Sequence, residues 1–371
     1  MRDPFIKRVE LAIRRWIIRT LRHFARPAAS VPIHLQYQRA KFLFVRQDMI
    51  GDVLISTPLF AALKSHYPGT VIDALLSPQN DFVLEHDPAI RRRWIYTKGP
   101  FSTFRLIRKI RNERYDFLVD LMDNPSATST LLTLLSGARW TVGLEKENAY
   151  AYDISMPLPS RRDSHIVDRI ARLLIPFGID PERENLAIRY FTSSDAEQFA
   201  DEFLKVKELA GRFVIGVNLS AGTDVRFWGE RNFISFLSAL HGSRPEDPVL
   251  LLYKPSDEGR ARRIRDAAPW CTLSPRTPSF DHFAALVRHL AVLVTPDTSA
   301  VHLASAFHIP SVVLYVQSNK ELRIWDPYRT PCESIVTEMD NLSIIEPAEV
   351  LHAVERLLAR VGKESPAHSV S

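Results

Sequence analysis

The chain has 371 residues, 46% hydrophobic and 25% charged, which is the composition of a soluble globular protein long enough for two domains. Its two cysteines argue against a disulfide framework and fit a reducing cytoplasm, and the absence of an apolar run of about 18 residues and of a signal peptide argues against a membrane span or export. Of the net charge of +5, residues 1–26 carry +6, from eight Lys or Arg against two acidic residues, and residues 27–371 carry −1. This nearly neutral remainder argues against a nucleic-acid partner.

Residues 1–27 are predicted to form a basic amphipathic helix. At about 100° per residue, one face is apolar and the opposite face is basic, with Leu11 and Ile18 as exceptions. The apolar residues are Phe5, Ile6, Val9, Ala12, Ile13, Trp16, Ile17 and Phe24, and the basic ones are Lys7, Arg8, Arg14, Arg15, Arg19 and Arg22. Such a helix either lies on an inner-membrane surface or packs on its own domain or on a partner.

Apolar strands then alternate with amphipathic helices in a first domain, residues 38–190. Strands are expected near 42–46, 70–75, 94–96, 116–120 and 139–142, with helices near 51–66, 79–86, 102–112, 127–135 and 164–177. A polar, Pro-containing segment, 178–195, is typical of a linker region.

The alternation restarts in a second domain, residues 205–345. Strands are expected near 212–218, 248–252, 271–273, 291–295 and 311–315, followed by a C-terminal helix at 346–361 and a disordered tail at 362–371. Alternation of this kind predicts an α/β protein of two Rossmann-like domains, with parallel sheets facing a central cleft.

The first candidate site follows the first strand. Gly51 and Asp52 open a helix directly after a short loop, which places the Asp52 carboxylate at the carboxyl edge of a sheet, where open α/β folds bind ligands. A carboxylate in this position either caps the helix or acts as a base.

The second candidate site is the turn from Asp297 to His302. A strand ends at Thr295-Pro296 and a helix follows, so the free amides of Thr298, Ser299 and Ala300 form a potential site for a phosphate or diphosphate. Asp297 is equally suited to a helix N-cap, and a lone helical His302 is more often a packed core residue than a ligand.

Two further segments follow strands of the second domain. The first offers small and hydroxyl residues with one fixed cation: Ser220, Gly222, Thr223 and Arg226. The second carries Asp257 and Glu258, where an acidic residue either holds a ribose hydroxyl or caps a helix. The chain contains neither GxGxxG nor GxxxxGK[ST], so NAD and P-loop functions have no support.

Together these motifs resemble glycosyltransferase family nine, the ADP-heptose:lipopolysaccharide heptosyltransferases. The similarity covers about residues 41–356 and is carried by four segments: Arg46-Gln-Asp-Met-Ile-Gly-Asp52-Val with Thr57-Pro58, Tyr115 to Leu121, Ser136-Gly137-Ala138 with Val142-Gly143, and Asp297 to Ala304. The chain departs from the family pattern at Arg226, where Lys is usual, and at Gly229, where Pro is usual.

The resemblance implies a GT-B architecture and an inverting transfer without a bound metal or cofactor. Asp52 would be the general base and Arg226 the phosphate-binding cation, with Arg46, Gly51 and Asp120 on the acceptor side. The donor would be a nucleotide-sugar, with ADP-heptose expected, bound by Ser220, Gly222, Thr223, Asp257, Glu258, Asp297, Thr298, Ser299, Ala300 and His302.

The predicted function is therefore transfer of a sugar to a lipopolysaccharide-core or other lipid-linked acceptor, by a cytoplasmic enzyme peripheral to the inner membrane. Two alternative functions fit the same motifs: a sugar-nucleotide epimerase of the same fold, and a non-catalytic nucleotide-sugar-binding module.

Overall fold

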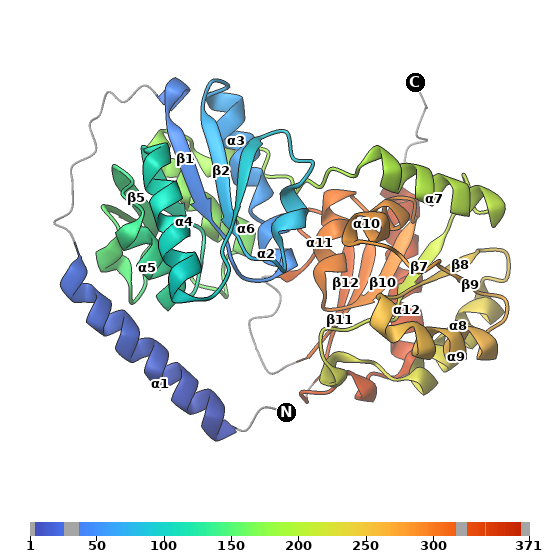
Figure 1. The fold of residues 1–371 in the computed structure, drawn as a ribbon. Coiled ribbons are helices and arrows are strands. Elements are labelled where there is room, and N and C mark those ends of the chain that lie inside the picture. Colours follow the sequence, from blue (N-terminus) through green and yellow to red (C-terminus); the bar gives the residue numbers. More distant parts are fainter. Residues whose placement is uncertain (1–3, 26–36, 317–324, 338, 365–371) are drawn as a thin grey trace. The chain divides into compact units, whose positions relative to one another are not determined.

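The computed structural model describes residues 4–25, 37–316, 325–337 and 339–364, and they fall into two units, 1–186 and 187–371 (Figure 1). The second unit begins before the predicted 205, because helix α7 (Ser194–Val206) packs on α10 (Phe280–Arg288). The predicted C-terminal helix is α12 (Pro347–Glu364), which packs on α8 (Glu230–Ser243) and so belongs to the second unit. The predicted tail lies almost entirely outside the described residues.

The first unit contains a six-stranded parallel sheet, sheet A, in the order β3-β2-β1-β4-β5-β6. Its strands are β1 (Lys41–Val45), β2 (Val71–Leu76), β3 (Ile90–Ile95), β4 (Phe117–Asp120), β5 (Trp140–Leu144) and β6 (Ile154–Met156). The helices are α1 (Pro4–Leu21), α2 (Ile50–Leu54), α3 (Thr57–His66), α4 (Pro100–Glu113), α5 (Ala127–Leu135) and α6 (Ile166–Ala171).

The second unit repeats this order in sheet B, β12-β11-β10-β7-β8-β9. Its strands are β7 (Ile215–Asn218), β8 (Val249–Leu252), β9 (Thr272–Leu273), β10 (Val292–Pro296), β11 (Ser311–Tyr315) and β12 (Cys332–Val336), and its remaining helices are α9 (Glu258–Ala267) and α11 (Ser299–Ala306). In both sheets the strand order reverses beside the first strand of the unit, which is the ligand-binding position of Rossmann-like folds.

Several helices and strands differ in extent or type from those predicted from the sequence. The helix expected at 51–66 is divided into α2 and α3, since Pro58 lies in the first turn of α3, where a proline starts a helix rather than continuing one. The helix expected at 79–86 is only a 3₁₀ turn, Asp81–Leu84, and the one expected at 164–177 becomes a 3₁₀ helix from Arg172, with Pro176 inside it. Strands β6 and β12 escaped prediction because neither is a continuous buried apolar run.

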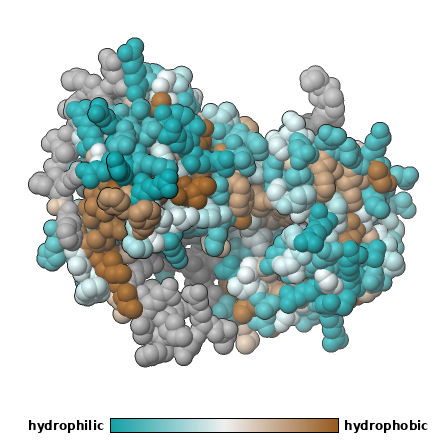
Figure 2. All heavy atoms as spheres, in the orientation of Figure 1, coloured by the Kyte–Doolittle hydropathy of each residue, from teal (hydrophilic) through white to brown (hydrophobic). Residues whose placement is uncertain are grey.

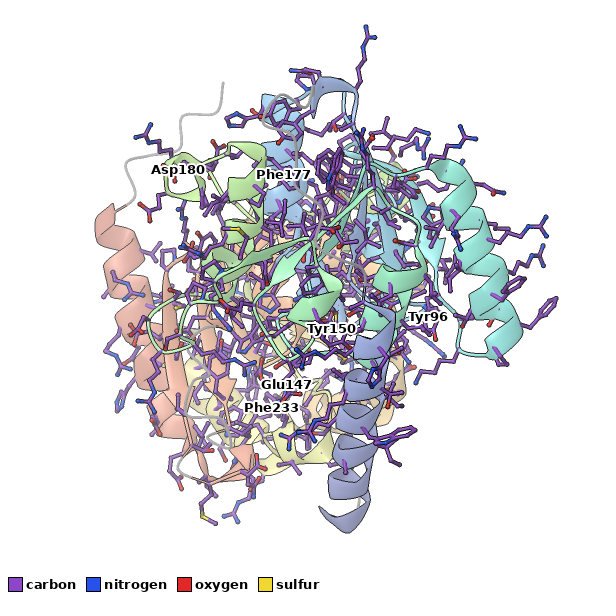
Figure 3. All side chains as sticks on the ribbon, turned by 90° about the vertical axis from the view of Figure 1, so that its left-hand side faces the viewer. Tyr96, Glu147, Tyr150, Phe177, Asp180 and Phe233 are labelled. Carbon is purple, nitrogen blue, oxygen red and sulfur yellow. The ribbon has the colours of Figure 1, made fainter. Side chains whose placement is uncertain are left out.

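Helix α1 packs on the first unit through the side that carries Ile18, not through its apolar stripe. Ile18, an exception to the apolar stripe, is 2% exposed, and the Tyr150 hydroxyl donates a hydrogen bond to its carbonyl oxygen (Figure 3 labels Tyr150). Ile13, Trp16 and Ile17 are exposed, since Trp16 lies roughly 160° from Ile18 around the helix axis. The packing with α5 therefore leaves the described part of the apolar stripe open to solvent.

No helix in the described ranges is both long and apolar enough to cross a membrane.

Candidate active site

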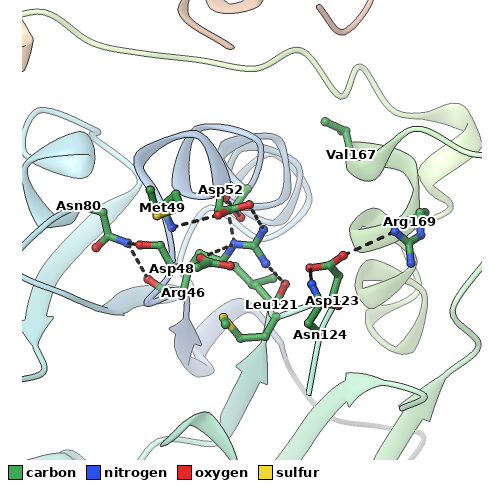
Figure 4. Close-up of polar contacts among 12 residues, drawn as sticks. Arg46, Asp48, Met49, Asp52, Asn80, Leu121, Asp123, Asn124, Val167 and Arg169 are labelled. Atoms are coloured by element: carbon green, nitrogen blue, oxygen red, sulfur yellow. Dashed lines mark hydrogen bonds and ion pairs between the residues drawn. The ribbon is translucent and has the colours of Figure 1, made fainter. Parts of the chain in front are cut away.

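Arg46 is the centre of the site in the first unit (Figure 4). It follows β1, is 1% exposed, and donates from Nε to the Asp52 carbonyl oxygen over 3.0 Å and from Nη1 to the carbonyl oxygen of Leu121. Although burial opposes its charge, the carboxylates of Asp48 and Asp52 keep the pKa of Arg46 above its ordinary value. Arg46 thus joins the loop after β1 to the loop after β4, at the point where the strand order reverses.

The Asp52 carboxylate is held from two sides. Oδ1 lies 3.2 Å from Nη2 of Arg46, and Oδ2 accepts the backbone N–H of Met49 over 2.9 Å. The Met49 bond is a cap interaction at the start of α2, so the capping interpretation of Asp52 is confirmed. Its side chain is still 14% exposed, and each carboxylate oxygen has a second lone pair, so the same group can accept a proton from a substrate. Gly51, its neighbour, lies inside α2.

Asp48 is a second carboxylate on Arg46 that the sequence analysis did not single out. Its Oδ1 lies 3.2 Å from Nε of Arg46. Burial raises the pKa of Asp48 to about 7, opposed by Arg46 and reinforced by the negative charge of Asp52. Arg46 therefore serves two carboxyl groups, one of which changes its charge near neutral pH.

Asp120, expected on the acceptor side, is 0% exposed and lies within a polar network. Its Oδ2 accepts hydrogen bonds from the hydroxyls of Ser129 and Tyr152 at 2.9 and 2.5 Å and lies 3.5 Å from Nζ of Lys146. Burial lowers the pKa of Lys146, against the attraction of Asp120. The Asp120 carboxylate is thus fully buried, and its Oδ1 accepts the backbone N–H of Met122, in the loop that follows β4, over 3.1 Å.

That loop carries a further ionic group that the motif search missed. Asp123, 5% exposed, lies 3.6 Å from Nη1 of buried Arg169 and 3.3 Å from Nη2 of Arg161, which also donates to Asn124 over 2.7 Å (Figure 4 draws Asp123, Asn124 and Arg169). Arg161 is 30% exposed and Arg169 only 2%. The partners come from segments far apart in the sequence, so no local pattern indicated them.

In the second unit, Arg226 and Asp297 form an ion pair, with Nη1 and Oδ2 3.1 Å apart. Burial raises the pKa of Asp297, while Arg226 lowers it. The cap of α11 is Thr298, whose hydroxyl accepts the N–H of Ala300 over 3.3 Å, so the alternative in which Asp297 is the N-cap is wrong. The Ala300 amide of the expected anion site is therefore already engaged, whereas the amides of Thr298 and Ser299 donate no backbone hydrogen bond within the described residues.

Asn218, at the end of β7, joins the two segments of this site. Its side-chain amide donates to the hydroxyls of Thr295 and Thr298 at 2.9 and 3.3 Å. Ser220 follows β7 and accepts the backbone N–H of Lys254 over 2.8 Å, while Gly222 and Thr223 are exposed in the same loop. Sheet B therefore brings the predicted phosphate loop and the α11 turn together.

Lys254 is a cation that the sequence analysis left unassigned. Its Nζ donates to the Ala221 carbonyl oxygen over 2.8 Å and lies 3.6 Å from Oδ2 of Asp257, and its side chain is 48% exposed. Glu258 instead accepts Arg262, one turn along α9, at 2.6 Å. Of the two acidic candidates, Asp257 therefore belongs to the loop cluster and Glu258 to the surface of α9.

His302 is 6% exposed, and its ring makes an edge contact with Trp325, with centroids 6.2 Å apart. This is the packed environment that the alternative interpretation described. Within the ranges that the structure describes, no group of three or more His, Cys, Asp or Glu side chains is arranged to hold a metal ion.

Comparison with known proteins gives consistent matches. A curated relative, lipopolysaccharide heptosyltransferase 3 of Escherichia coli, is 25% identical over 83% of this chain and 96% of its own. The structure is similar to that of a glycosyl transferase family 9 protein from Veillonella parvula DSM 2008, with a TM-score of 0.73, 18% identity, and coverage of 88% and 99% of the two chains.

It is also similar to the Escherichia coli heptosyltransferase WaaC with ADP-2-deoxy-2-fluoro heptose, with a TM-score of 0.70, 17% identity, and coverage of 85% and 99%. These structural matches and the two parallel sheets confirm the predicted α/β fold of two Rossmann-like domains of the GT-B type. The family model for glycosyltransferase family 9 (heptosyltransferase) matches residues 103–346, more than half of the sequence. The chain therefore belongs to glycosyltransferase family 9, and the predicted enzyme class, a glycosyltransferase, is confirmed.

Proposed function

We propose that this enzyme transfers a heptose from ADP-heptose to a sugar of the lipopolysaccharide core, with inversion and without a metal ion. The curated relative is named a lipopolysaccharide heptosyltransferase, and WaaC was solved with an ADP-heptose analogue. The observation that carries the mechanism is the partly exposed Asp52 carboxylate, held by Arg46 and the Met49 amide at the carboxyl edge of sheet A.

Inversion requires one base, which removes the proton of the acceptor hydroxyl while its oxygen attacks the anomeric carbon. Asp52 is oriented for this role, because two fixed donors hold its carboxylate and a second lone pair on each oxygen stays available. Arg46 limits the rotation of the side chain, so the orientation is set before the acceptor binds. When Asp48 loses its proton, near its pKa of about 7, it adds a second negative charge beside the Arg46 guanidinium.

The leaving nucleoside diphosphate gains negative charge as the glycosidic bond breaks, and it needs cationic and amide donors. Arg226 and Lys254 are 39% and 48% exposed, so both can reach a ligand, and the amides of Thr298 and Ser299 lie at the N-terminus of α11. Arg226 is already paired with the Asp297 carboxylate. When the donor binds, the guanidinium would turn from this carboxylate to the diphosphate.

A donor screen tests the proposal directly. The purified enzyme is mixed with ADP-heptose, GDP-, UDP- or dTDP-sugars, and either a heptose-deficient lipopolysaccharide core or no acceptor, and products are identified by mass spectrometry. We expect acceptor-dependent release of ADP from ADP-heptose and an inverted anomeric configuration in the product. Turnover of a UDP-sugar without acceptor would indicate an epimerase, and tight binding without turnover would indicate a binding module; either result contradicts the proposal.

We further propose that α1 attaches the enzyme to the cytoplasmic face of the inner membrane, where such an acceptor is anchored. Ile13, Trp16 and Ile17 are exposed while Arg15 and Arg19 lie on the same helix, which is the composition of an interfacial anchor.

Replacing Trp16 and Ile17 by Ser should reduce co-sedimentation with phosphatidylglycerol vesicles by about tenfold, because two interfacial side chains are lost. The matched control is Val206→Ser, which removes an apolar side chain that is 76% exposed on α7 in the second unit. Equal vesicle binding by the α1 variant and the wild type would show that α1 is a packing helix only.

A further inference from the structure

The first two turns of α4 expose aromatic side chains. Phe101 and Phe104 are 79% and 67% exposed, the two most exposed phenylalanines in the described part of the chain. They lie three residues apart and so share one face of the helix. The opposite face is used for the core, where Leu106, Ile107 and Ile110 are buried. The two rings are therefore not needed for folding α4 onto sheet A.

The segment around these rings is strongly basic. Residues 97–112 contain five Lys or Arg and no acidic residue: Lys98, Arg105, Arg108, Lys109 and Arg111. All five side chains are exposed, and in the described ranges none of them forms an ion pair with a carboxylate. Arg105 and Arg108 each follow one of the aromatic residues by one helical turn, on the same face.

The surface formed by Phe101, Phe104, Arg105 and Arg108 lies at the same edge of sheet A as Asp52. Helix α4 begins shortly after the end of β3, and α2 begins shortly after the end of β1, so both helices start at the carboxyl edge of sheet A. The exposed rings and Asp52 therefore lie at one edge of one sheet. Figures 1 and 3 show that α1 also runs past this edge towards its N-terminus, and Figure 2 shows hydrophobic residues gathered in the corresponding lower left part of the unit.

We propose that the start of α4 is a second membrane contact, with Phe101 and Phe104 inserted at the level of the lipid headgroups and Arg105 and Arg108 bound to anionic phospholipid. The inference rests on the proposed function in one respect, since a lipid-linked acceptor is what makes a membrane-facing carboxyl edge useful. Aromatic rings flanked by cations suit the interface of an anionic bilayer. A second protein copy fits less well, because five like charges on each copy would repel and a stable interface needs about 800 Å² from each partner.

Two contacts fix an orientation that α1 alone cannot. A single interfacial helix leaves the unit free to rotate about the helix axis, whereas the start of α4 turns the carboxyl edge, and with it Asp52, towards the lipid surface. A glycan anchored in that surface then meets the edge that carries the base. The surface thereby contributes to the use of lipid-linked acceptors without touching the reacting atoms.

The test uses the full-length chain with Phe101→Ser and Phe104→Ser combined, and separately Arg105→Gln and Arg108→Gln combined. The control combines Phe191→Ser and Phe213→Ser, which removes two exposed rings, 37% and 45% exposed, from the second unit. Binding is measured by flotation with vesicles of phosphatidylcholine alone or mixed with phosphatidylglycerol. We expect the ring variant to lose about tenfold or more in binding to the mixed vesicles. The arginine variant should lose most of the preference for anionic lipid, and the control should bind as wild type.

Transfer is then measured with a short soluble core saccharide and with the same glycan on a vesicle-embedded lipid. The ring variant should match wild type on the soluble acceptor and lose several-fold in rate on the embedded one. Unchanged vesicle binding by the ring variant would overturn the proposal, as would a wild-type dimer that the substitutions convert to a monomer without affecting vesicle binding. Absence of transfer by the wild type would contradict the proposed function alone, because vesicle binding is read independently.

Discussion

Asp52→Asn is expected to lower kcat for sugar transfer by about 10²- to 10⁴-fold, the usual contribution of a positioned general base. The amide is nearly isosteric, and its oxygen can still accept the Met49 N–H, but it cannot take up the proton of the acceptor hydroxyl. The measurement is kcat at saturating donor and acceptor, together with the KM for each. KM for the donor should change little, because Asp52 is proposed to act on the acceptor.

Asp48→Asn is the matched control for this variant. Like Asp52→Asn, it replaces a carboxyl group beside the same guanidinium by an amide, since both carboxyl groups lie 3.2 Å from Arg46. The two variants are compared above about pH 7, where Asp48 is ionised. We expect a much smaller loss of kcat than for Asp52→Asn. Near-wild-type turnover by Asp52→Asn would mean that its carboxylate is only a helix cap, worth about 1 kcal/mol of stability, and the proposed mechanism would be wrong.

Replacing Arg46 by Met is expected to reduce the free energy of unfolding by about 3–5 kcal/mol, the cost of leaving buried partners without their counter-charge. Arg46 is 1% exposed and serves the carboxylates of Asp48 and Asp52 and the carbonyl oxygen of Leu121. Met fills much of the volume but supplies no donor. The measurement is denaturant unfolding of the variant and the wild type at equal pH.

The control is Arg183→Met, whose guanidinium is 86% exposed and lies 3.2 Å from Asp180. An exposed pair of this kind contributes about 0–1 kcal/mol, so this variant should unfold almost as the wild type does. A loss for Arg46→Met no larger than that of the control would show that the loops after β1 and β4 do not depend on the buried guanidinium.

The pH dependence follows from Asp48. Its pKa of about 7 in the folded protein lies above the usual value near 3.9 for an unfolded chain, so the protonated form favours folding below about pH 4, and this contribution is lost as the pH rises to about 7. Below about pH 7 Asp48 is protonated in the folded wild type, so its attraction to Arg46 is lost there as well. The deficit of Arg46→Met should therefore be smaller at about pH 5 than at about pH 8.

Most of the fold could be predicted from local sequence patterns. Buried parallel strands such as Phe42 to Val45 are continuous apolar runs, and their alternation with amphipathic helices leads to two Rossmann-like domains. The exceptions have local causes, since β12 is only partly buried and Pro58 divides one helix. The location of Asp52 at a sheet edge also follows from the chain order of strand, loop and helix.

The tertiary structure decided which partners each site residue has. The sequence alone left Asp52 as a cap or a base and Asp297 as a cap or a ligand; the structure shows Asp52 held by Arg46 and Asp297 paired with Arg226, 71 positions away in the chain. The sequence likewise determined that α1 has an apolar and a basic face, but only packing showed that Ile18 contacts the domain and Trp16 does not. The physical reason is the same in each case. Periodicity determines which side chains share a face or an edge, whereas the groups opposite them come from distant segments that only the folded chain brings together.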